Sequence, residues 1–109
     1  MSDLASRHCS PAHGPALSTD SAHALLGQLS GWTMSTGAKE IRKTFPFENY
    51  HQAIAFVNAV AWIAHREDHH PDITAGYNKV AVAYATHSVS GLSENDFICA
   101  AKVDALVTR

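Results

Sequence analysis

The sequence has little of several features that mark particular classes of protein. Its 109 residues include only two cysteines, too few for the disulfide framework of a small secreted domain. No apolar run approaches the roughly 18 residues that a membrane-spanning helix needs, and the N-terminus lacks the apolar segment of a signal peptide. The formal net charge is -2, so neither nucleic acid nor a membrane surface is expected as a direct partner. These absences favour a soluble protein of the reducing cytoplasm.

Histidine, in contrast, is abundant, because the chain has eight. Three of them, His65, His69 and His70, fall in the single stretch HREDHHPD, and His87 follows later in the chain. Imidazole changes its charge close to neutral pH, so an excess of histidine points weakly to proton transfer or to metal binding.

Residues 1–17 differ in character from the rest of the chain. They carry Ser, Pro, Gly and His without periodicity, which favours a flexible or loosely docked arm. His8, Cys9 and His13 are metal-ligand types, but a closed zinc site needs four ligands at recognisable spacing. A disordered tail is the favoured interpretation, and residues 18–109 are expected to form a single domain.

The domain shows helical and strand patterns in turn. In chain order they predict a helix over 18–31, a hairpin over 32–47, a helix over 49–67, a hairpin over 72–86 and a helix that begins at a capping box over 93–96. Consecutive hairpins predict antiparallel pairing. The expected fold is α+β in the order α-β-β-α-β-β-α, with a four-stranded antiparallel sheet and helices packed on one face.

The helix over 49–67 is more apolar than one buried face requires. Ala53, Val57 and Val60 form one stripe, and Phe56 and Ile63 widen it toward a second face. Such a helix is expected to bury one side on its own sheet and another on a second subunit. We therefore expect a homo-oligomer.

A metal site in HREDHHPD is disfavoured by the spacing. His65 and His69 are four residues apart, as in helical zinc motifs, but those add a third ligand and place a catalytic Glu between the histidines. Glu67 lies on the wrong face of the helix for that role, and His87 could join the set only through folding. No metal site is therefore expected.

A proton-transfer site fits the same residues better. Pro71 ends the long helix and disfavours helical backbone at His70, so the side chains of His69 and His70 should diverge. His87 ends the strand that returns toward them, and three imidazoles could then line one cavity as general acids and bases. Asp96 has a structural role available as the last residue of its capping box, and the residues alone favour that role.

Together these residues resemble the pterin-4a-carbinolamine dehydratase family, over a match from about Leu25 to Leu106. The matching positions are His65, His69-His70-Pro71, Tyr77-Asn78-Lys79-Val80, Thr86-His87, Gly91-Leu92-Ser93 and Asp96. Gly31-Trp32 and the stretch FENYHQA also resemble family features. The chain departs from the family at His65, where Glu is common, and at Ser88, where some members have an acid.

The resemblance implies a hydro-lyase that dehydrates 4a-hydroxytetrahydropterin to quinonoid dihydropterin and so recycles the pterin cofactor of aromatic amino acid hydroxylases. It implies that His69, His70 and His87 are catalytic. The residues expected to support the site or to bind substrate are Asp96, His65, Pro71 and Thr86. It implies no metal and no organic cofactor. The family fold is also α+β, and its members form dimers or tetramers by pairing sheets and packing long helices.

Two other functions fit the same resemblance. Some relatives also stabilise dimers of a transcription factor, and the apolar helix could serve such a partner as readily as self-assembly. A domain that binds a pterin without turning it over would need the same pocket. Measurement of activity separates this last function from the enzyme.

Overall fold

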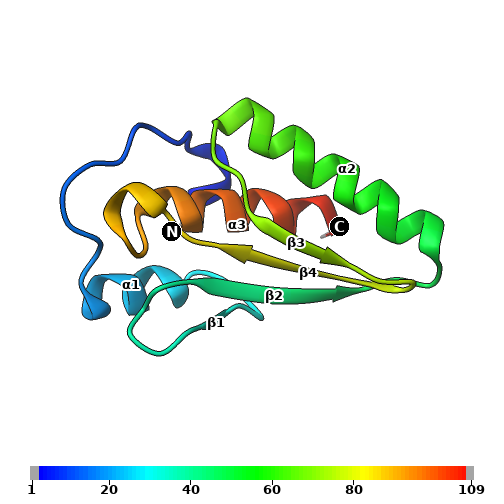
Figure 1. Ribbon diagram of the computed structural model, residues 1–109, viewed down its shortest axis with the longest axis horizontal. Coiled ribbons are helices and arrows are strands. Elements are labelled where there is room, and N and C mark those ends of the chain that lie inside the picture. Colours follow the sequence, from blue (N-terminus) through cyan, green and yellow to red (C-terminus); the bar gives the residue numbers. More distant parts are fainter. Residues whose placement is uncertain (1–2, 108–109) are drawn as a thin grey trace.

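The structure is a computed structural model that describes residues 3–107, and its elements follow the predicted order (Figure 1). The helices are α1 (Thr19–Leu26), α2 (Tyr50–Glu67) and α3 (Glu94–Val107), with short 3-10 helices η1 (Leu4–Ser6) and η2 (His87–Val89). The strands are β1 (Thr33–Met34), β2 (Ile41–Pro46), β3 (Asp72–Ala75) and β4 (Lys79–Tyr84). The predicted sequence of helices and strands is therefore confirmed.

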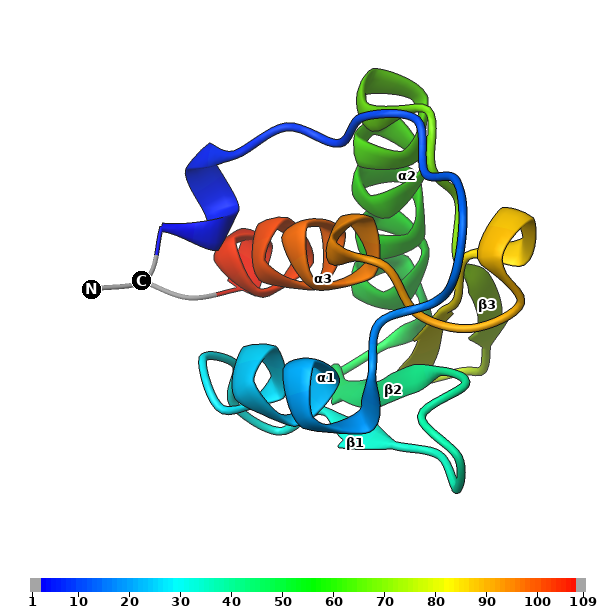
Figure 2. The same ribbon diagram turned by 90° about the vertical axis from the view of Figure 1, so that its left-hand side faces the viewer.

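The four strands form one antiparallel sheet in the order β1-β2-β4-β3. Along β4, the side chains of Val80, Val82 and Tyr84 are fully buried beneath the helices, as strand alternation requires. Figure 2 shows α1, α2 and α3 on the same side of the sheet. The expected α+β fold, with helices on one face, is confirmed.

Helix α2 has a well-defined start and end. The Asn49 side chain accepts a hydrogen bond from the Gln52 N–H at 2.9 Å, as an N-cap should. Asp68 closes the helix in the left-handed conformation, with φ of 52°, two residues before His70. The chain then turns extended through Pro71 into β3, which places His69 and His70 at the junction between helix and sheet.

Some expected bounds were wrong. Helix α1 ends at Leu26 instead of Gly31, because the Gly27 N–H closes the helix and the next residues turn away from it. In α3 the buried residues include Cys99 and Val103, whereas Leu106 near the end of the helix is exposed. Among residues 3–107, no helix combines the length and apolar character that crossing a bilayer demands.

The N-terminal segment lies along the helical side of the molecule (Figure 2). It passes the C-terminal end of α2 and the start of α3 before it reaches α1. The Asn95 side chain accepts a hydrogen bond from the Ser10 N–H at 3.2 Å and donates one to the Ser10 carbonyl at 2.7 Å. The Leu17 N–H donates to the Leu92 carbonyl at 2.9 Å. Hydrogen bonds to its backbone therefore hold the arm against the rest of the domain. That the arm is flexible stays a prediction.

Candidate active site

Among the predicted histidines, His69 is the one whose ring is held by contacts on its face and on its edge. Its ring stacks on the ring of Tyr84, with centroids 5.8 Å apart and planes 13° from parallel. Its Nε2 atom lies 2.6 Å from Oδ1 of Asp96, and the side chain is only 12% exposed. Two contacts therefore fix the ring, one through its face and one through its edge.

Asp96 lies in the first turn of α3 and is fully buried. Its Oδ2 atom accepts hydrogen bonds from the Thr86 hydroxyl at 2.7 Å and from the Ser93 N–H at 2.9 Å. Because the Thr86 proton is engaged by Asp96, the Ser93 hydroxyl is the donor in its 2.7 Å contact with Thr86. With His69, this makes three donors around one buried carboxylate. The expected capping role of Asp96 is present, and the same side chain also binds His69.

This arrangement determines which nitrogen of His69 is free. With Asp96 as a carboxylate, which only accepts hydrogen bonds, the Nε2 atom of His69 carries the proton of this contact. In the neutral ring, Nδ1 then holds the lone pair, and no other described residue hydrogen-bonds to Nδ1. A carboxylate that orients imidazole in this way prepares it to accept a proton at the opposite nitrogen.

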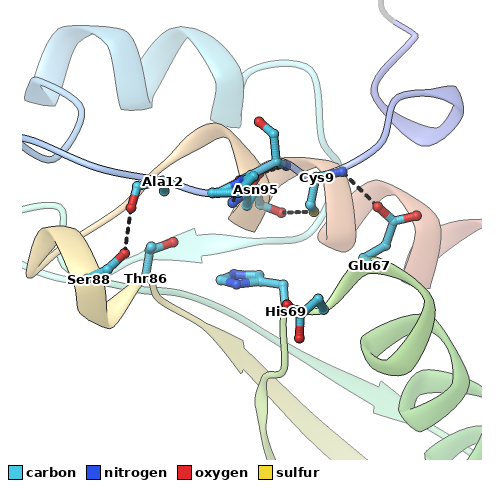
Figure 3. Close-up of a pocket in the computed structure, with 10 residues that line it drawn as sticks. Cys9, Ala12, Glu67, His69, Thr86, Ser88 and Asn95 are labelled. Carbon is cyan, nitrogen blue, oxygen red and sulfur yellow. Dashed lines mark hydrogen bonds between the residues drawn. The ribbon is translucent and has the colours of Figure 1, made fainter.

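A cavity of about 240 Å³ opens beside His69 (Figure 3). Its walls come from the arm, the end of α2, the start of α3 and the segment after β4. The lining residues are Cys9, Ser10, Pro11, Ala12, Glu67, Asp68, His69, Thr86, Ser88 and Asn95. Figure 3 shows the His69 ring beneath Asn95 and Cys9, with Glu67 to one side.

His70 and His87 line a different cavity, of about 100 Å³, together with Glu40 and Asp72. Asp72 pairs with Ala83, which alternates with the buried Val82 and Tyr84, so this cavity lies on the sheet face without helices. The structure thus brings His70 and His87 together and places His69 elsewhere. The expectation of one cavity for all three histidines was wrong. The chain diverges at Pro71, so the side chains of His69 and His70 point to opposite faces of the sheet.

One segment nevertheless connects the two groups. Thr86, which binds Asp96, is followed directly by His87, and both line a further cavity of about 220 Å³. Thr86 also lines the cavity beside His69, and His87 also lines the cavity beside His70. The segment that follows β4, residues 85–88, therefore borders all three cavities.

The other two predicted supporting residues, His65 and Pro71, do not line the cavity beside His69. The His65 ring is exposed and lies against the ring of Trp62, with centroids 5.3 Å apart. It lines none of the cavities described above. Pro71 is half-buried and contributes through the turn that separates His69 from His70.

Glu67 is the site residue that the sequence reasoning missed. Its side chain is 5% exposed and accepts hydrogen bonds from the Cys9 N–H at 2.7 Å and from His8 Nδ1 at 2.9 Å. Burial raises the pKa of Glu67, but these hydrogen bonds and the nearby Lys102 outweigh it, so the net pKa lies below the usual value. A carboxylate in the last turn of a helix opposes the helix dipole, and that signal could have suggested a specific partner.

Within residues 3–107, no three His, Cys, Asp or Glu side chains gather in an arrangement that could hold a metal ion. Of the candidate ligands in the arm, His8 contacts Glu67, and Cys9 contacts the thiol of Cys99.

Comparison with known proteins identifies the family. The model of the pterin 4 alpha carbinolamine dehydratase family matches residues 15–106. The chain belongs to this family. A Nitrosospira multiformis protein named for the same dehydratase is 59% identical over 108 residues, which cover 97% of this chain and 94% of that protein. A Nitrosomonas eutropha relative is 56% identical over 108 residues, covering 96% and 94%.

Solved structures of two relatives share the fold but carry different descriptions. A transcriptional coactivator/pterin dehydratase of Brucella melitensis superposes with a TM-score of 0.81 at 33% identity, over 85% of this chain and 99% of that one. A pterin dehydratase-like protein described as a RuBisCO assembly factor of the alpha-carboxysome gives a TM-score of 0.61 at 28% identity, over 71% and 89%.

Proposed function

We propose that this dehydratase-family chain converts 4a-hydroxytetrahydropterin to quinonoid dihydropterin and water by histidine acid/base catalysis. The observation that supports this best is the His69–Asp96 pair, held by Thr86 and Ser93 at the edge of a cavity. A carboxylate-oriented imidazole is suited to take a proton from a ring N–H, which the reaction requires.

The proposed roles follow from the hydrogen bonds. His69 accepts the N–H proton of the pterin at Nδ1, because Nε2 is engaged by Asp96. His70 or His87 donates a proton to the departing 4a-hydroxyl, which leaves as water. The substrate is proposed to lie along Thr86 and His87, since that segment borders both groups of histidines. No metal and no organic cofactor takes part in this mechanism.

Stopped-flow measurement of dehydration in His69→Ala, His70→Ala and His87→Ala tests the proposal. Loss of a general acid or base is expected to lower kcat by about 10²- to 10⁴-fold. His51→Ala is the matched control, because His51 is an exposed histidine of α2 that lines none of the cavities described above. Wild-type rates in all three site variants would refute the mechanism.

A role in protein assembly is the second candidate. On α2, Trp62 is 59% exposed and Tyr50 is 51% exposed, although both are large apolar side chains. We propose that α2 and the sheet edges β1 and β3 pair copies of the chain into a homodimer or homotetramer. The same surface could instead serve another protein, as the descriptions of the two solved relatives suggest for those proteins.

Light scattering after size-exclusion chromatography separates these uses of the surface. A stable oligomer that Trp62→Ser dissociates supports self-association, whereas a monomeric wild type favours a foreign partner.

A pterin that binds without turnover would support the non-catalytic alternative. The proposed link to an aromatic amino acid hydroxylase, and a cytoplasmic location, rest on the family resemblance and the paucity of cysteine.

A further inference from the structure

The two cysteines of the chain meet beside the proposed active site. Cys9 belongs to the N-terminal arm and Cys99 to α3, 90 positions apart, yet their Sγ atoms are 3.5 Å apart. Both are free thiols. A disulfide bond is about 2.05 Å long, so the sulfurs must approach by roughly 1.5 Å to form one. Cys9 lies in an irregular segment, which can make that adjustment without disturbing a helix or strand.

The surroundings give the two thiols different roles. Cys9 is half-buried and lines the cavity beside His69, whereas Cys99 is fully buried. The hydrogen bond with Cys9, followed by burial, raises the pKa of Cys99 far above that of an ordinary thiol. A reagent in solution therefore reaches Cys9 first, and Cys99 is placed to react with the product.

Packing alone is the simpler explanation, since a free cysteine often behaves as a small apolar residue. Packing accounts well for Cys99, a residue of α3 that belongs to the hydrophobic core. It also applies to Cys9, which packs against the core, but the Cys9 side chain borders the cavity beside His69 as well. Two thiols in contact across 90 positions form a ready-made redox pair.

We propose that Cys9 and Cys99 form a reversible disulfide that fastens the N-terminal arm over the cavity beside His69. The oxidant is a low-molecular-weight disulfide such as oxidised glutathione. Disulfides that form in reducing compartments are usually transient and serve to sense redox conditions. The bond itself is independent of the proposed function, and only its effect on turnover rests on that function.

The chemistry balances over two exchange steps. The Cys9 thiol loses its proton to water, and its thiolate attacks one sulfur of oxidised glutathione, releasing one glutathione thiol and leaving a mixed disulfide on Cys9. The Cys99 sulfur then attacks the Cys9 sulfur and releases the second glutathione thiolate, which takes the Cys99 proton. Two electrons pass from the protein thiols to the oxidant, and two glutathione thiols are formed.

The position of the arm explains why this bond would affect the site. Residues 9–12 form one wall of the cavity, whose volume of about 240 Å³ is below the roughly 300 Å³ at which small-molecule pockets usually begin. In the proposed switch, the arm moves outward to admit a pterin. Hydrogen bonds to Glu67, Asn95 and Ser88 permit that movement, but a covalent bond to α3 prevents it.

Equilibration of the full-length protein with reduced and oxidised glutathione tests the bond directly. We expect the intact mass to fall by two hydrogen atoms and peptide mapping to join Cys9 to Cys99. Hydrogen exchange at the Cys9 and Ser10 amides should slow in the oxidised protein. Two free thiols at every redox ratio, or a lasting glutathione adduct on Cys9, would overturn the proposal. Cys9→Ser is the control, since it cannot form the internal bond.

Turnover tests the consequence. In the oxidised wild type, kcat/KM should fall by about tenfold or more, because the fraction of molecules with an open arm sets the apparent affinity. A dithiol reductant should restore it, and Cys9→Ser should show equal rates under both conditions. Unchanged turnover in a fully disulfide-bonded protein would refute the fastening of the arm. A protein that forms the bond but never dehydrates pterin would refute the proposed function and leave the thiol pair intact.

Discussion

Replacement of Asp96 by Asn should separate the proton-transfer role of this side chain from its capping role. Asn has nearly the same shape, but its amide offers one acceptor oxygen and one donor NH₂ group. The Thr86 hydroxyl and the Ser93 N–H both need an acceptor at the Oδ2 position, so the amide oxygen should turn toward them. The NH₂ group then faces His69, which must accept at Nε2 and carry its proton at Nδ1.

The expected loss follows from that change of tautomer. With a proton on Nδ1, His69 can no longer accept the pterin N–H proton, and kcat should fall by about 10²- to 10⁴-fold. That range corresponds to about 3–5 kcal/mol of activation free energy. All three contacts survive, the one to His69 with donor and acceptor exchanged, but the carboxylate charge is lost. The free energy of unfolding should therefore fall by only about 1.5–3 kcal/mol, the worth of one hydrogen bond to a charged group.

Stopped-flow dehydration and urea denaturation measure the two effects separately. Asp104→Asn is the matched control, because Asp104 is also an aspartate of α3 that accepts hydrogen bonds, here from Trp32 and Lys43, away from the cavity beside His69. It should lower stability and leave kcat unchanged. If Asp96→Asn loses stability but keeps the wild-type kcat, Asp96 is a cap alone and the role assigned to it is refuted.

Two further predictions concern the neighbours of this pair. Thr86→Val removes the hydroxyl that donates to Asp96 and should lower the free energy of unfolding by about 1–3 kcal/mol, and kcat as well. Thr44→Val, on the exposed face of β2, should change neither quantity, and equal behaviour of the two variants would contradict the network. Glu67→Gln tests the docking of the arm. Because the pKa of Glu67 is lowered in the folded protein, its carboxylate stabilises the fold above the ordinary value of 4.5, and this contribution is lost as the pH falls through the lower folded value. The thermal midpoint of the wild type should therefore drop more steeply below pH 4.5 than that of Glu67→Gln, and parallel curves would show that Glu67 does not hold the arm.

The fold was largely predictable because its signals are local. Alternation along β4 places Val80 and Val82 on one face, which is the buried one, and Asn49 marks the start of α2. The end of α1 was less predictable, since Leu29 continues the helical spacing although the chain has already turned at Gly27. Apolar spacing reports which side chains are buried, and a turn can bury the same residue as a helix.

The site was only partly predictable, because its contacts join distant parts of the chain. The divergence of His69 and His70 followed from Pro71, but the side of the sheet each would reach did not. The residues alone favour a capping role for Asp96, whereas the two oxygens of its carboxylate both cap α3 and contact His69. The docking of the arm had no local signal, since Cys9 meets Glu67 and Cys99 at separations of 58 and 90 positions.

The most direct test of the central claim is a stopped-flow dehydration assay of purified protein with a metal chelator present. We expect acceleration of 4a-hydroxytetrahydropterin dehydration above the uncatalysed rate, unaffected by the chelator and lowered by about 10²- to 10⁴-fold in His69→Ala. A rate no greater than background, or activity that disappears when the chelator is added, would contradict metal-free histidine catalysis.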